Sequence, residues 1–130
     1  MTINIGAVVA CTVAAFILSS VWYMVFSKAR ATMLKLNLEE ERKPKPQNIA
    51  LELLRTFVLA LLFAIILSKQ ATNSLGESLQ LGLLLWLAFP AILLSGSVMW
   101  DKVPARLAAI HAGDWLIKIL LIAAIIGAWR

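Results

Sequence analysis

The chain contains one cysteine and one histidine, and these scarcities exclude several kinds of site. A single cysteine, Cys11, cannot form an internal disulfide and has no second cysteine for a metal-binding or redox motif. A single histidine, His111, excludes a bis-histidine haem and a His-rich zinc site. No Gly-rich phosphate loop, Gly-x-Ser-x-Gly or His-Glu-x-x-His sequence occurs. We therefore expect no metal, no cofactor and no enzymatic activity.

Acidic residues are also scarce, with 7 Asp and Glu against 12 Lys and Arg, so the formal net charge is +5. A basic chain can bind nucleic acid, but here the basic residues flank long apolar runs. Attraction to anionic lipid headgroups explains them in that position. We expect membrane lipids as partners and no nucleic acid.

Apolar residues are abundant. They make up 62% of the chain, whereas soluble domains have about 45–50%, and the mean hydropathy is +0.89. Four apolar runs occupy about residues 3–26, 49–68, 79–99 and 105–129. Each run is long enough, as a helix, to cross a hydrocarbon core about 30 Å thick. The sequence predicts one membrane domain over residues 1–130, an all-α bundle of four transmembrane helices. We also expect a homo-oligomer, because so small a bundle has little interior of its own.

The four prolines mark where helices are interrupted. Pro44 and Pro46 end the basic loop 27–48, whose first half suits an amphipathic helix at the headgroups, and Asn48 is a plausible N-cap for the second span. Pro90 lies inside the third span and predicts a kink. Pro104 suits the first position of the last helix. Between the second and third spans, the sequence predicts a short polar loop over residues 69–78.

The distribution of Lys and Arg predicts the orientation in the membrane. The loops after the first and third spans carry Lys28, Arg30, Lys35, Arg42, Lys43, Lys45, Lys102 and Arg106. The opposite side carries only Lys69 and Arg130. Because positive loops stay in the cytoplasm, we expect a protein of the cell inner (plasma) membrane with both termini outside the cytoplasm.

Three ionisable residues, His111, Asp114 and Lys118, lie inside the last apolar run. An ionisable side chain at membrane depth costs at least a few kcal/mol, so it needs a partner, a water-filled cavity or a function. At about 100° per residue these three share one helical face. The opposite face carries small residues that suit close helix packing: Ala105, Ala109 and Gly113. We therefore expect this helix at the centre of the bundle or at a subunit contact.

The second span supplies the other half of a possible polar cluster. Glu52 and Arg55 lie in its first two turns, and both spans begin at the same membrane face. Counted from those starts, Arg55 and His111 both lie about 9 Å deep. Arg55 could therefore pair with Asp114, and Glu52 with His111. Two alternatives are a Glu52–Arg55 pair within the helix and an Asp114–Lys118 pair at the favourable spacing of four.

Two interpretations of this cluster stay open. Its residues either neutralise one another and only fix helix packing, or transport a solute or a proton, with His111 and Asp114 as the relay. Trp115 could flank a cationic solute. In the first span, Ser19 and Ser20 are interpreted as packing hydroxyls. Trp22-Tyr23 is either an interfacial anchor or an aromatic pair that faces another helix.

Several short stretches resemble the bacterial integral membrane family called domain of unknown function 1761. They are residues 82–89 (GLLLWLAF), 110–117 (IHAGDWLI) and 127–130 (GAWR), with Trp22-Tyr23 and the Leu-Glu-Glu-like stretch 36–40 at the family's positions. The resemblance covers nearly the whole chain and implies four spans but no activity. This chain has Asp114 where the family commonly has an aromatic residue, so the resemblance implies a charge specific to this protein.

Overall fold

The computed structural model describes residues 3–35, 37, 45–70 and 74–129. Four helical segments in this part are long and apolar enough to cross a membrane: Ile5–Val25 (α1), Pro46–Ser68 (α4), Leu75–Trp100 (α5, η1 and α6) and Ala105–Ala128 (α7). A further short helix, α2, spans Ser27–Leu34. The described residues include no strand. The expected all-α bundle of four membrane-length helices is confirmed, and the short helix in the first half of the basic loop is present.

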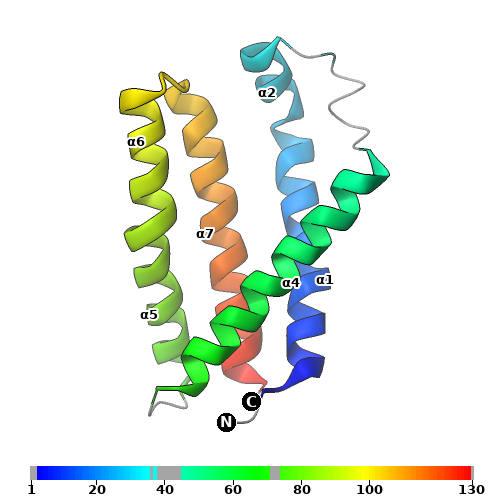
Figure 1. Ribbon diagram of the computed structural model, residues 1–130, viewed down its shortest axis with the longest axis vertical. Coiled ribbons are helices and arrows are strands. Elements are labelled where there is room, and N and C mark those ends of the chain that lie inside the picture. Colours follow the sequence, from blue (N-terminus) through cyan, green and yellow to red (C-terminus); the bar gives the residue numbers. More distant parts are fainter. Residues whose placement is uncertain (1–2, 36, 38–44, 71–73, 130) are drawn as a thin grey trace.

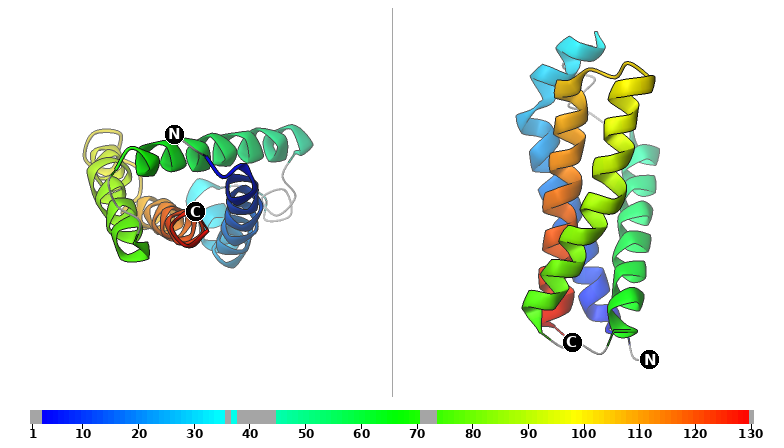
Figure 2. Two further views of the ribbon diagram at one scale, coloured as in Figure 1. Left: turned by 90° about the horizontal axis from the view of Figure 1, so that it is seen from below. Right: turned by 90° about the vertical axis from the view of Figure 1, so that its left-hand side faces the viewer.

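Helix α7 lies at the centre of the bundle. It packs against α1 on one side and α5 on the other, while α4 crosses α1 obliquely, as Figure 1 and the view from below in Figure 2 show. The two ends of the chain lie at the same end of the molecule, opposite α2 (Figure 1). The last helix was expected at the centre of the bundle or at a subunit contact. Within one chain it lies at the centre of the bundle.

The third span changes from α-helical to π-helical geometry around Pro90, where its sequence predicts a kink. Leu75–Trp86 (α5) and Ile92–Trp100 (α6) are joined by the π-helical turn Leu87–Ala91 (η1), which contains Pro90. A wider turn accommodates a residue that has no N–H to donate, so the helix continues through it. The span begins at Leu75, because the hydroxyl of Ser74 accepts a hydrogen bond from the N–H of Glu77 at 3.1 Å. The loop predicted over residues 69–78 therefore extends too far, because residues 75–78 belong to helix α5.

Prolines also set two helix starts differently from expectation. Helix α4 begins at Pro46 after Lys45, so Asn48 lies in its first turn and is not the N-cap. Proline suits this place because its fixed φ is helical and its missing N–H would have no partner there. At α7, Pro104 is the cap and Ala105 the first helical residue.

Small residues let α5 and α7 approach closely. A methyl group at Gly82 would lie 3.1 Å from Ile119 and 3.2 Å from Ala123, and one at Gly127 would lie 2.7 Å from Ser78. The hydroxyl of Ser78 donates to the carbonyl of Ala123 at 2.7 Å. These contacts join the two helices along the half of the molecule that holds the chain ends.

The same half is filled by an apolar core. Its members come from the first half of α1 and the second halves of α4 and α7: Val8, Cys11, Ala15, Ala60, Phe63, Ala64, Leu67, Ile119, Ile122, Ala123 and Ile126. Cys11 is fully buried within it, which agrees with a packing role. The end of the molecule that carries the chain termini is therefore closed by packed side chains, and the polar residues gather in the other half.

Candidate functional site

Three polar stripes converge on one cavity in the half of the molecule nearer α2. The cavity has a volume of about 530 Å³. Its polar and charged lining comes from α1 and α2 (Ser19, Ser20, Tyr23, Ser27, Arg30), from α4 (Asn48, Glu52, Arg55) and from α7 (His111, Asp114, Trp115, Lys118). The structure thus brings together all six solute-site candidates expected from the sequence, and adds a wall from α1 and α2.

Asp114 and Lys118 form the buried floor of this site. They are 3% and 4% exposed, and Asp114 Oδ2 lies 3.6 Å from Lys118 Nζ, one turn apart on α7. The hydroxyl of Ser19 donates to Asp114 Oδ1 at 2.6 Å. A buried carboxylate needs such partners, because desolvation otherwise costs several kcal/mol. The favourable spacing of four between Asp114 and Lys118 is used as the sequence predicts.

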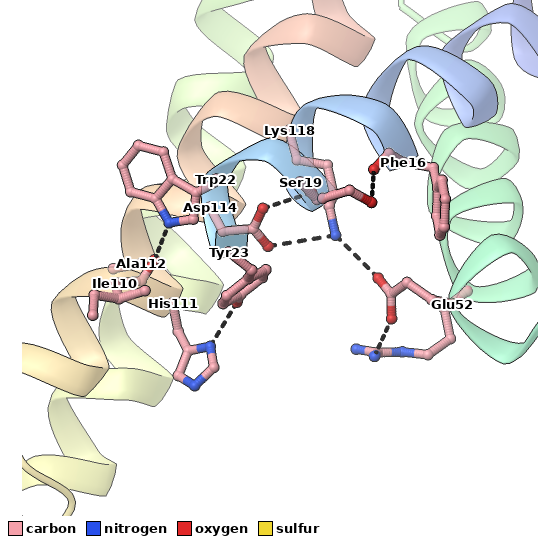
Figure 3. Close-up of polar contacts among 12 residues, drawn as sticks. Phe16, Ser19, Trp22, Tyr23, Glu52, Ile110, His111, Ala112, Asp114 and Lys118 are labelled. Carbon is pink, nitrogen blue, oxygen red and sulfur yellow. Dashed lines mark hydrogen bonds and ion pairs between the residues drawn. The ribbon is translucent and has the colours of Figure 1, made fainter. Parts of the chain in front are cut away.

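Lys118 lies between two carboxylates. Its Nζ is also 3.3 Å from Glu52 Oε1, so it links α7 to α4 (Figure 3). The same nitrogen lies 5.1 Å from the centre of the Trp115 ring, within the range of a cation–π contact. Because the chain's own lysine occupies this aromatic face, Trp115 does not offer it to a cationic solute.

Two cross-helix pairs considered from the sequence do not form. Arg55 Nη1 bonds to Glu52 Oε2 at 2.8 Å, within α4, and does not reach Asp114. Side chains lean toward the start of their own helix, so the long Arg55 side chain extends back toward Glu52, and it is 66% exposed. His111 bonds to α1, so it does not pair with Glu52.

His111 is held by the tyrosine of α1. The hydroxyl of Tyr23 and Nδ1 of His111 are 2.7 Å apart, and the guanidinium carbon of Arg30 lies 4.9 Å from the Tyr23 ring centre. Figure 3 shows the His111 ring on the far side of Tyr23 from the pair formed by Asp114 and Lys118. The histidine is thus positioned through one nitrogen.

Two tryptophans fix the backbone of α7 around His111. Trp22 Nε1 donates to the carbonyl of Ile110 and Trp86 Nε1 to that of Ala112, both at 2.9 Å. The Trp22 ring lies directly on Gly113, where a methyl group would be 2.5 Å from it. Of the two interpretations of the Trp22-Tyr23 pair, the structure supports the pair that faces another helix.

The small-residue stripe of α7 is used only in part. Gly113 contacts Trp22, but Ala105 and Ala109 are exposed. Close packing between helices uses other small residues instead, on α5 and at the end of α7, because α5 crosses α7 nearest that end. A subunit contact through Ala105 and Ala109 stays a prediction.

The wall contributed by α1 and α2 is not among the site residues predicted from the sequence. Ser19, Tyr23, Ser27 and Arg30 follow one another at spacings of four, four and three, which places them on one helical face that continues from α1 into α2. This spacing is the signal that could have identified them together. It is a weak one, because the first span has no charge and hydroxyls alone are common in helix packing.

Some residues that support the sequence-based predictions lie outside the described part of the chain. They are residues 36 and 38–40 of the Leu-Glu-Glu-like stretch, Pro44, and three of the basic residues used for topology, Arg42, Lys43 and Arg130. Among the residues that the structure describes, no three His, Cys, Asp or Glu side chains are grouped so that they could hold a metal ion.

Four membrane-length helices and a half-buried cluster of charges define a small multi-pass helical membrane protein. Residues 6–127 match the protein family described as "Protein of unknown function (DUF1761)". The chain belongs to this family, which confirms the resemblance found in its sequence. No curated protein and no solved structure matches it. The function therefore has to be inferred from the site itself.

Proposed function

We propose that this is a non-enzymatic membrane protein that binds a small polar solute in the cavity and carries it across the membrane. The observation that supports this proposal best is the cavity of about 530 Å³ beside the buried pair Asp114 and Lys118. Pockets that enclose small molecules have volumes of about 300–1,000 Å³. Ion pairs that only fix packing need close contact and no such space.

The position of the cavity supports one step of a transport cycle. Its lining includes Arg30 on α2 and Asn48 in the first turn of α4, at the end of the molecule where the basic loops lie. The apolar core closes the opposite end. In this proposal the cavity faces the cytoplasm of a cell with the protein in its inner membrane, and both termini are outside. His111 and Asp114 are the groups that would exchange a proton with the solute.

The alternative proposal is a structural or accessory membrane subunit. The observation in its favour is Lys118, whose bonds to Asp114 and Glu52 join α7 to α4. Under this alternative the charges fix helix packing and the cavity holds only water or lipid. Lipids and further copies of the chain are the partners we propose under either function, because large apolar side chains are exposed along the spans.

A substitution that fills the cavity without removing a charge separates the two functions. Ser20 lines the cavity and is exposed, and among the described residues it bonds only to the carbonyl of Phe16 in its own helix, at 2.8 Å. Ser20→Phe should leave every ion pair and the stability intact but reduce transport at least tenfold. Asp114→Asn should likewise remove transport, while Asp101→Asn, the same change at an exposed turn, should have no effect.

The measurement is uptake into proteoliposomes of labelled acetate, phosphate or methylammonium, and of protons followed with an entrapped pH dye. Stability is measured in parallel by unfolding in detergent. If no probe moves faster than in empty liposomes, transport of these classes is excluded. If Asp114→Asn lowers stability and Ser20→Phe changes nothing, the accessory role is the correct one.

A further inference from the structure

The acidic groups of the cavity are already occupied by the chain's own cations. Asp114 bonds to Ser19 and Lys118, at 2.6 and 3.6 Å. Glu52 bonds to Arg55 and Lys118, at 2.8 and 3.3 Å. A cationic ligand would have to displace the exposed Arg55 from Glu52, or displace Lys118 and leave that buried lysine unpaired.

The aromatic faces are occupied in the same way. The ammonium of Lys118 lies over Trp115, with its nitrogen 5.1 Å from the ring centre, and the guanidinium of Arg30 lies over Tyr23 at 4.9 Å. Tryptophan and tyrosine faces are the other common binding surface for organic cations. The ring face that the chain's own cation covers, on Trp115 and on Tyr23, is therefore closed to another cation.

The cavity instead offers hydrogen-bond donors. A guanidinium has five N–H donors, and within the described part of the chain Arg55 bonds only to Glu52, through Nη1. His111 Nδ1 lies 2.7 Å from the Tyr23 hydroxyl, and in the tautomer in which Tyr23 donates this bond, Nε2 carries a hydrogen that it can donate. Arg55 and His111 both line the cavity, one from α4 and one from α7.

The charge of the lining also favours an anion. Three basic side chains (Arg30, Arg55 and Lys118) face two acidic ones (Glu52 and Asp114), which leaves a formal charge of 3 − 2 = +1 with His111 neutral. The first turn of α4 contributes Asn48 to the lining, so the positive end of that helix dipole lies beside the cavity.

We propose that the ligand of this cavity is a small anion with a carboxylate or phosphate oxygen group, bound through the Arg55 guanidinium with Arg30 and His111 nearby. Arginine suits this role because its planar fork matches both groups with two parallel hydrogen bonds. The inference rests on the proposed function, whose cavity it uses, and it names the class of ligand. A carboxylate or phosphate group of this kind can belong to a free solute or to the headgroup of an anionic lipid.

The test is binding to purified, delipidated protein in a neutral detergent. The probes are sodium acetate, sodium phosphate and, as the cation, ethylammonium chloride, all compared with sodium chloride at equal ionic strength. Binding is followed by tryptophan fluorescence, since Trp115 lines the cavity, and by the shift in thermal unfolding. We expect acetate or phosphate to bind saturably and ethylammonium not to bind.

A matched pair of arginine variants tests the residue assignment. Arg55→Gln should weaken anion binding at least tenfold, and Arg55→Lys should weaken it less, because the charge stays but the fork is lost. Arg106→Gln removes an arginine from an exposed position in the first turn of α7, outside the lining, and should leave binding unchanged. Equal losses in the Arg55 and Arg106 variants would mean a diffuse charge effect and would overturn the proposal.

A second arm identifies the source of the anion. Acetate or phosphate bound to delipidated protein supports a free solute. Binding of phosphatidic acid in nanodiscs that is weakened by Arg55→Gln but not by Arg106→Gln, with neither small anion bound in detergent, supports a lipid headgroup. Binding of ethylammonium alone, or of no probe in either arm, overturns the inference. Anion binding without any uptake into proteoliposomes would refute transport but not the ligand class. Uptake of methylammonium alone would support transport but refute an anion as the ligand.

Discussion

Replacing Gly113 with alanine tests the contact that holds α1 against α7 beside the site. A methyl group there would lie 2.5 Å from Trp22 Cζ2 and 2.9 Å from Cη2, which is closer than carbon atoms approach. The ring cannot simply turn away, because its Nε1 bonds to the carbonyl of Ile110 at 2.9 Å and its centre lies 4.8 Å from that of the Phe26 ring. The added methyl group must therefore displace the indole and its neighbour Tyr23.

The size of the effect follows from three contributions. Alanine in place of a helical glycine favours the helix by about 1 kcal/mol. Overpacking costs about 1–3 kcal/mol, and loss of the indole hydrogen bond about 0.5–1.5 kcal/mol. Gly96→Ala is the matched control, because nothing lies within 4 Å of a methyl group there. Gly96→Ala should gain only the roughly 1 kcal/mol from helix propensity. The free energies of unfolding of the two variants should therefore differ by about 1.5–4.5 kcal/mol.

The assay is reversible unfolding of both variants in mixed micelles with increasing dodecyl sulfate, followed by far-ultraviolet circular dichroism. Gly113→Ala should unfold at lower dodecyl sulfate than the parent chain, and Gly96→Ala at an equal or higher concentration. Equal stability of the two variants would contradict the close contact between Trp22 and Gly113, and with it the position of α1 at the cavity.

Two further predictions concern the α1 wall and the orientation. Ser19→Ala removes the 2.6 Å donor to Asp114 and should cost about 0.6–2 kcal/mol in the same unfolding assay. The adjacent Ser20→Ala should cost almost nothing, because that hydroxyl bonds within its own helix; equal costs would count against the Ser19–Asp114 bond. A cysteine at position 2 or 130 should react with an impermeant maleimide added to intact cells, and protection of both positions would contradict the proposed orientation.

The polar cluster was partly predictable because helix periodicity is a local property. Spacings of three and four along one helix are enough to place Asp114 beside Lys118 and Glu52 beside Arg55, and both pairs form. Depth comparison also places these residues in the same half of the bundle. Depth comparison does not identify the contacts between helices. The depth of a residue does not give the rotation of its helix about its own axis or the distance between two helix axes.

Contacts across helices depend on how closely each pair packs. Helix α1 lies against α7 because Gly113 admits Trp22, and this brings Tyr23 to His111 and Ser19 to Asp114. The sequence marks Gly113 as suited to close packing and Trp22-Tyr23 as a possible pair facing another helix, but it does not identify them as partners of each other. The same close packing keeps His111 away from Glu52, whose partner on α7 is Lys118.

A bundle of four membrane-length helices can be predicted from the residues alone, because apolar run length and the few prolines, caps and basic loops act locally or through the bilayer. The residues of one helix that share a face can be predicted in the same way. Which faces meet is set by the fold, since that depends on the fit of side chains such as Trp22 on Gly113. The fold also decides that the charges surround a cavity, because that space exists only where three helices diverge around Glu52, Asp114 and Lys118.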